Sequence, residues 1–128
     1  LTRAYDLPPA TYAFSLYLER LPQYAPVRVY EPLPRFPGTT RDIALVVEQG
    51  VNAGELASAA RQSGAAYLID VEAFDEYRGK QVGDGKKSIA FRIVLRRPDA
   101  TITDDEANAS TAVIVAALKR QFGATLRD

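Results

Sequence analysis

The side chains best suited to chemistry lie in one predicted hairpin, between residues 74 and 103. From Arg78 to Arg97 the chain carries seven Lys or Arg and one acid, whereas the whole sequence balances 16 basic against 16 acidic residues. Asp75 and Tyr77 stand just before this basic stretch. Positive charge gathered at one place on a neutral protein is typical of a surface that meets a polyanion. Lysines that protect a sheet edge from aggregation give the same pattern, so charge alone leaves both interpretations open.

Catalysis by this chain itself is not expected, because the side chains that usually perform it are missing. The sequence contains no His, no Cys and no Met. Their absence removes imidazole bases, thiolate nucleophiles and most zinc chemistry. We therefore predict no catalytic residue, no metal site and no cofactor in this chain. The lack of Met even at position 1 indicates a fragment or a processed product.

Two short patterns suggest ligand sites but have simpler explanations. The glycines at 79 and 85, with two Lys and Ser88 after them, superficially resemble a phosphate-binding loop. The spacing is one residue too long, and a strand follows where such a loop needs a helix. The acids at 99 and 104–106 lack the spacing of a calcium loop. Those at 104–106 suit a helix start, where negative charge is favoured.

The composition is that of a globular domain. Apolar residues make up 47% and charged residues 25% of the 128 residues, as in ordinary folded domains. No apolar run approaches the roughly 18–20 residues that a membrane span needs. The N-terminus lacks the order of a signal peptide. The absence of cysteine agrees with a cytoplasmic location.

The first third of the chain is rich in proline and holds seven of the eight prolines. Proline fixes φ and removes a backbone donor, so this region is neither mostly helix nor central strand. Alternating side chains predict a strand over residues 11–19, and residues 27–30 form a second candidate. Residues 31–40 resemble an extended linker. We therefore assign residues 1–34 to a neighbouring module and its linker, and residues 35–128 to one domain.

The second part of the chain shows a regular order of elements. A helix begins at Asn52 and ends by Gly64, and a longer one begins with a capping box at Thr103 and ends at Gly123. The predicted strands cover residues 42–48, 67–77, 87–96 and 124–127. This order predicts an α+β fold of the ferredoxin-like, split βαβ class. Such a fold is a four-stranded antiparallel sheet with both helices on one face, here preceded by a strand-containing extension.

The other face of such a sheet stays uncovered, and strand parity predicts what it carries. On the strand at 87–96, Ser88, Arg92 and Arg96 alternate with apolar residues that must face the helices. Their alternation places these polar side chains on the open face.

The strand at 67–77 poses a parity problem. If it were regular, Asp75 would share the buried face with Ile69, and burying an unpaired charge is costly. A β-bulge near Ala73 and Phe74 would turn Phe74 inward and send Asp75 and Tyr77 to the open face. We therefore predict a bulge at this point.

Four motifs resemble one family in the same order. They are FP at 36–37 with RDIALVV at 41–47, FDEYRG at 74–79, GKKSIAF at 85–91 and TITDDE at 101–106. Together they resemble the ferredoxin-fold anticodon-binding domain that ends the β subunit of bacterial phenylalanyl-tRNA synthetases. The resemblance covers about residues 35–128. Residues 1–34 are similar to the tail of the catalytic-like module that precedes this domain.

The resemblance implies that the open face and the hairpin hold the anticodon of phenylalanine tRNA. At the matching positions, Asp75, Tyr77 and Ser88 would contact the wobble guanine. A tyrosine ring can stack on an unpaired base, and a carboxylate can accept two hydrogen bonds from the ring N–H and amino group of guanine. The cations expected to hold phosphates without reading sequence are Arg78, Lys86, Lys87 and Arg92.

The resemblance also implies a larger parent enzyme. It would be a phenylalanine–tRNA ligase that uses ATP and Mg²⁺ and assembles from two α and two β subunits, with this chain as a non-catalytic tRNA-binding module. An alternative of a different class stays open: a ferredoxin-like domain that senses a small molecule or oligomerises through the same face. Salt separates the two, because ions compete with phosphate contacts but not with apolar association.

Overall fold

The N-terminal part of the chain contains a short helix where a strand was expected. The computed structural model describes residues 6, 8, 11–24, 30 and 33–127, and the chain divides into two units after residue 32. In the first unit, residues 11–17 have no regular secondary structure and the 3₁₀ helix η1 spans Leu18–Tyr24. The strand predicted over residues 11–19 is therefore wrong, since an alternating pattern makes a strand only where a partner strand exists. Of the strand predicted at 27–30, only Tyr30 lies within the described residues, and it has no regular structure.

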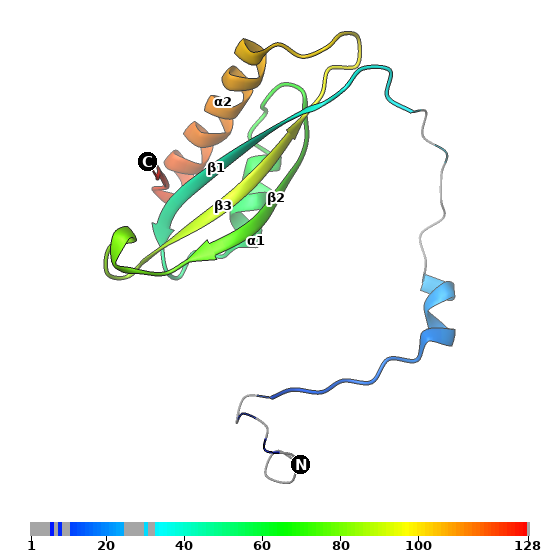
Figure 1. Cartoon of the computed structure of the whole chain (residues 1–128), viewed down its shortest axis with the longest axis vertical. Helices are drawn as coiled ribbons and strands as arrows, with labels where there is room; N and C mark the ends of the chain where they lie inside the picture. The colour runs from blue at the N-terminus through cyan, green and yellow to red at the C-terminus, as the bar shows by residue number, and fades with distance from the viewer. Residues whose placement is uncertain (1–5, 7, 9–10, 25–29, 31–32, 128) are drawn as a thin grey trace. The chain divides into compact units, whose positions relative to one another are not determined.

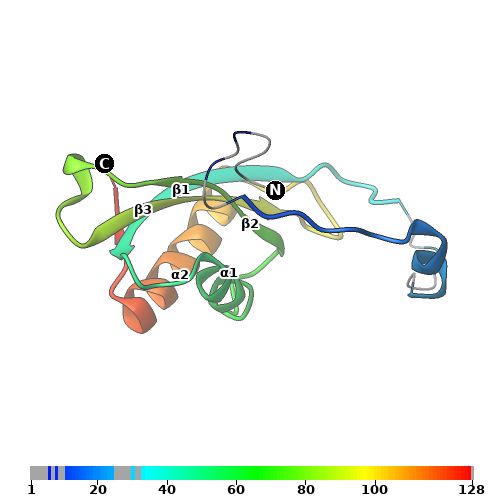
Figure 2. The ribbon, with the colours of Figure 1, turned by 90° about the horizontal axis from the view of Figure 1, so that it is seen from below.

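The second unit has the predicted order of strands and helices (Figure 1). Its elements are β1 (Thr39–Glu48), α1 (Ala53–Arg61), β2 (Leu68–Tyr77), the 3₁₀ helix η2 (Lys80–Val82), β3 (Lys86–Leu95), α2 (Asp104–Phe122) and β4 (Thr125–Leu126). The strands form one antiparallel sheet in the order β2-β3-β1-β4. Both helices lie on one side of it (Figure 2). The α+β, ferredoxin-like prediction is confirmed, and within residues 33–127 no helix lies over the opposite face of the sheet.

Local signals set the ends of the helices. At the start of α2 the Thr103 hydroxyl accepts a hydrogen bond from the Glu106 N–H, and the Glu106 carboxylate accepts one from the Thr103 N–H. Gly123 ends α2 in the left-handed conformation with φ 66°. The Asn52 side chain caps α1 by accepting from the Gly54 N–H at 2.7 Å. α1 ends at Arg61, earlier than the predicted stop.

The hydrophobic core lies between the sheet and the two helices. β3 contributes every second side chain to it, as predicted from parity, and Phe91 is the largest of the fully buried residues. The strand residues buried in this core are Leu45, Val47, Val71, Ile89, Phe91, Ile93 and Leu95. The fully buried helix residues that meet them include Leu56, Ala60, Ile114 and Leu118.

Two adjacent residues of α2 test which face of the helix meets the sheet. Ile114 is fully buried, whereas Val113 is 44% exposed. We expect Ile114→Ala to lower the free energy of unfolding by about 2–5 kcal/mol, because it leaves a cavity in the core. Val113→Ala should change it by less than about 0.5 kcal/mol. Urea denaturation of both variants measures the difference, and equal losses would contradict this packing.

Candidate nucleic-acid interface

A β-bulge in β2 decides which side chains reach the open face, and the sequence-based prediction of this bulge is confirmed. In the pairing with β3, Asp75 follows Ala73 directly, so Phe74 has no opposite residue. Strand parity is reversed beyond this point. Asp75 and Tyr77 therefore share the open face with Ser88, which lies opposite Tyr77.

Phe74 itself does not turn inward, contrary to the prediction. Its side chain is half exposed, and the Arg92 guanidinium lies over its ring, 5.1 Å from the centroid. Ala73 already takes the position opposite the buried Phe91. The bulged residue is therefore left at the rim of the sheet, where its ring packs against an open-face arginine.

Small side chains line the middle of the open face beside Asp75. Ala44 and Ala90 pair across β1 and β3, and Asp75 lies opposite Ala90 on β2. One neighbouring row of side chains carries Tyr77 and the other carries Arg92. Rows on one face of a sheet lie roughly 7 Å apart. A flat ring could therefore lie over the alanines, with the Asp75 carboxylate at its edge.

Tyr77 is held in place by contacts from two other segments. A Cβ atom at Gly79 would overlap the Tyr77 hydroxyl and ring, so the ring lies directly against this glycine. The Arg127 guanidinium lies over the ring, 4.8 Å from its centroid, and its Nη2 donates a hydrogen bond to Gln81 Oε1 at 2.9 Å. The side chain remains 38% exposed. Its role as a stacking platform stays a prediction, but its position is defined.

Ser88 lies on the predicted face but is covered. Only 3% of it is exposed, and its neighbours across the strands are Tyr77 and Val46. Within residues 33–127 the Ser88 hydroxyl forms no hydrogen bond. Little of Ser88 is therefore open to a base. Asp75, by contrast, is exposed.

The position of Lys87 does not support its predicted role in holding an RNA backbone. Lys87 is only 6% exposed and lies opposite Val47, on the side of the sheet that packs against the helices. Its Nζ donates a hydrogen bond to the Glu76 carboxylate at 3.2 Å. The bulge turns Glu76 to this same side, so the acid neutralises a buried cation.

The remaining predicted cations differ in how free their charge is. Arg92 donates two hydrogen bonds to Asp42, at 2.9 and 2.7 Å. Arg78 donates to Glu76 at 2.7 Å. Lys86 is exposed and forms no ion pair with another residue of the second unit as described. Lys86 thus best keeps the predicted role, while Arg78 and Arg92 carry charge that acids largely offset.

Arg127, Gly79 and Gln81 were not identified from the sequence. Gly79 belongs to the FDEYRG motif, and its closeness to Tyr77 in sequence could have signalled a contact. Arg127 is 50 residues from Tyr77 along the chain. No spacing rule connects two residues that meet only through the pairing of β4 with β1.

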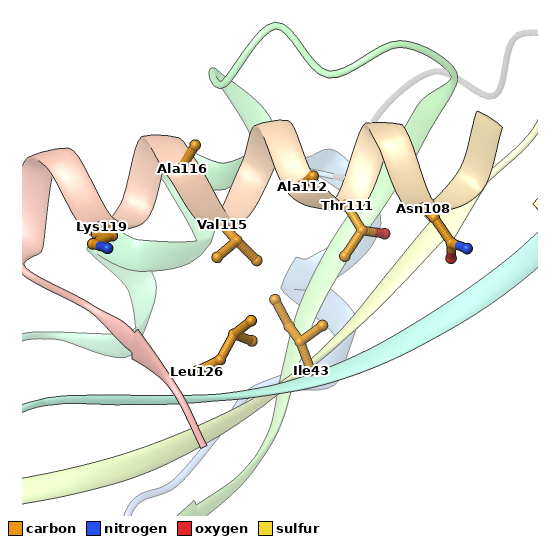
Figure 3. A pocket seen from close by; sticks show the side chains of 8 residues that line it. All are labelled: Ile43, Asn108, Thr111, Ala112, Val115, Ala116, Lys119 and Leu126. Atoms are coloured by element: carbon orange, nitrogen blue, oxygen red, sulfur yellow. The ribbon is translucent and has the colours of Figure 1, made fainter. Parts of the chain in front are cut away.

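An apolar pocket of about 430 Å³ lies away from these residues, between α2 and the edge formed by β1 and β4 (Figure 3). Its wall is largely apolar, with Ile43 and Leu126 facing α2 residues such as Val115 (Figure 3). Lys119 is its one cationic residue. The pocket lies on the helix side of the sheet. With a single cation and no aromatic ring in its wall, it lacks what a nucleic-acid site needs.

The described ranges contain neither a metal-binding cluster nor a membrane-spanning helix. They contain no group of three or more His, Cys, Asp or Glu side chains placed to hold a metal ion. No helix in the same ranges has the length and apolar character needed to cross a membrane. The acids near the start of α2 instead serve its cap and pair with Arg41 and Arg97.

The fold and the open face together define a ferredoxin-like binding module. Residues 34–127 match the model of the ferredoxin-fold anticodon binding domain, and the chain belongs to this family. It is 44% identical over 126 residues (98% of the chain) to the phenylalanine–tRNA ligase β subunit of Geobacillus kaustophilus. It is 42% identical over 127 residues (98%) to that of Moorella thermoacetica and 40% over its full length to that of Dickeya dadantii. The chain spans about 16% of the length of each of these relatives.

Two glycine substitutions test whether the position of Tyr77 matters. Gly79→Ala should displace the Tyr77 ring, because the added methyl group would overlap it. We expect weaker RNA binding, by about ten-fold, from the lost stacking. Gly50→Ala is the matched control, since nothing lies within 4 Å of its Cβ position. Binding to an RNA anticodon stem-loop measures both, and equal effects would show that the Gly79 contact is unimportant.

Acid should weaken the ion pairs of Glu76 and Asp42. Hydrogen bonds from Arg78 and Lys87 lower the pKa of Glu76 below its usual 4.5, and those from Arg92 lower the pKa of Asp42 below 3.8. A lowered folded-state pKa gives stability that is present above the unfolded-state value and is lost as the pH falls through the folded value. We therefore expect the melting temperature to decrease as the pH is lowered below about 4.5. Glu76→Gln should flatten this dependence, and an unchanged curve would rule out a contribution from Glu76.

Proposed function

We propose that this chain binds the anticodon of phenylalanine tRNA with the open face of its sheet. The observation that carries the proposal is the position of Asp75. It is exposed, lies beside the small Ala44 and Ala90 and is one row from Tyr77. None of the ion pairs within residues 33–127 involves it. Membership of an anticodon-binding family and the names of the relatives support the choice of RNA.

Asp75 suits the recognition of guanine at the wobble position. Its ionised carboxylate only accepts hydrogen bonds, and guanine offers two donors side by side, the ring N–H and the amino group. Adenine presents an acceptor at the ring nitrogen, which would face the carboxylate unfavourably. Two-point hydrogen bonding of this kind separates bases by about 1–3 kcal/mol.

The other residues of the face supply affinity. Tyr77 offers a ring for stacking, which is worth about 1–3 kcal/mol for a base. Lys86 and, with part of its charge offset, Arg78 would hold phosphates near the hairpin. Ser88, of which little is exposed, would add to the base contacts, and Arg92 would contribute through its partly exposed side.

We further propose that the chain works as part of a phenylalanine–tRNA ligase β subunit. In that setting the rest of the enzyme would bind ATP and Mg²⁺ and charge the tRNA in the cytoplasm, as an assembly of two α and two β subunits. Residues 1–34 would belong to the preceding catalytic-like module. The near-complete exposure of Tyr12 and Phe14, both 92%, supports this assignment, because such rings are normally buried against a partner.

Association through the open face is a less suitable role for this surface. The face carries the charged pair Asp42–Arg92 and the acids Glu72 and Asp75. Interfaces between permanently associated copies have apolar cores with few charges. The hydrogen-bond donors on exposed base edges fit these acids better than the apolar centre of such an interface would.

A base substitution combined with one mutation tests the reading role. The wild-type chain should bind phenylalanine tRNA more tightly than a version with adenine at the wobble position. Asp75→Asn should weaken binding of the natural tRNA about ten-fold or more, because the new amide donor opposes the guanine donors. The preference between the two RNAs should then disappear. Fluorescence titration at low salt gives the four dissociation constants.

Asp84→Asn is the matched control. Asp84 is an exposed acid in the loop of the same hairpin, so Asp84→Asn changes the net charge by the same amount as Asp75→Asn. It should keep the preference for guanine. If Asp75→Asn also keeps it, Asp75 does not read the base, and if the wild type shows no preference, the chain does not read the wobble position.

A further inference from the structure

Arg127 contacts residues of the open face from just beyond the strand β4. Its backbone N–H donates to the Ala44 carbonyl at 2.9 Å, which continues the pairing of β4 with β1 beyond Leu126. Its side chain reaches Tyr77 and Gln81 beside the β2–β3 hairpin. Its backbone and its side chain are thus fixed by separate segments of the domain.

The charge of Arg127 is not offset by an acid within residues 33–127. Its side-chain partners there are the ring of Tyr77 and the neutral amide of Gln81. Arg78, Lys87 and Arg92 are all paired with carboxylates instead. Arg127 therefore places a positive charge next to the proposed base platform. The predicted hairpin arginines do not provide such a charge, because carboxylates offset theirs.

The guanidinium also retains hydrogen-bonding capacity. Arginine has five N–H donors in one plane, and in residues 33–127 the Arg127 side chain uses a donor only at Nη2, toward Gln81. A guanidinium stacked on a ring keeps its donors at the edge of the stack. A phosphate group can accept two of them at once, a geometry that lysine cannot provide.

We propose that Arg127 is an RNA-binding residue that completes the anticodon site by holding Tyr77 and binding a phosphate beside the stacked base. This proposal rests on the proposed function and adds a contact to it. One face of the Tyr77 ring is taken by the guanidinium, so the wobble base stacks on the ring from one side only. The phosphate that follows or precedes that base then meets the free edge of Arg127.

Three variants separate the charge of Arg127, its planar geometry and the loss of any surface charge. Arg127→Gln removes the charge and should weaken binding of phenylalanine tRNA about ten-fold. It should also reduce by about one the slope of log affinity against log salt, because one phosphate contact is lost. Arg127→Lys should keep the salt slope but bind several-fold more weakly, because the planar fork is lost. Arg120→Gln on the exposed last turn of α2 is the control and should change neither value.

The salt slope separates a contact from a merely structural role, because a loosened Tyr77 would lower affinity at every salt concentration without changing the slope. Wild-type affinity and slope in Arg127→Gln would overturn the proposal, and tighter binding would show that Arg127 covers the ring instead. Each variant is also titrated with the wobble-substituted tRNA. A wild type that prefers guanine while Arg127→Gln behaves identically contradicts only the role of Arg127. A wild type without preference contradicts the reading of the anticodon.

Discussion

The bulge in β2 is the constraint on which the rest of the site depends. One extra residue reverses the parity of the strand end, and this single change has two effects. It moves Asp75 and Tyr77 out of the core and onto the open face. It also turns Glu76 toward the helices, where the acid meets the buried Lys87. A chain without the bulge would bury an unpaired carboxylate and leave Lys87 without a counter-charge.

The sequence predicted the fold well because its signals are local. The capping box at Thr103, the glycine at 123 and the alternation along β3 each involve residues within a few positions of one another. The bulge was also predictable, since the cost of burying Asp75 requires it. The same logic failed for residues 11–19, whose alternation is equally regular. Strand formation needs a partner strand, and alternation carries no information about whether one is present.

The site was predicted less completely, because side-chain partners are often distant in sequence. The positions of Asp75 and Tyr77 follow from strand parity together with the bulge, and both can be inferred from one strand. The pairing of Arg92 with Asp42 spans 50 residues, and so does the stacking of Arg127 on Tyr77. Neither leaves a sequence pattern. A count of lysines and arginines therefore located the basic region. It could not show which of these cations form ion pairs with acids of the same domain.

The brevity of β4 has a consequence for the thermal behaviour of the open face. Only two residue pairs and one further backbone hydrogen bond join β4 to β1, whereas β1 and β3 pair over ten residues. Segments held by few backbone hydrogen bonds open at a free energy well below that of global unfolding. Fraying of β4 would release Arg127 and free the ring of Tyr77 while the core stays intact. We therefore expect the contacts of Arg127 with Tyr77 and Gln81 to be lost at a lower temperature than the fold of the domain.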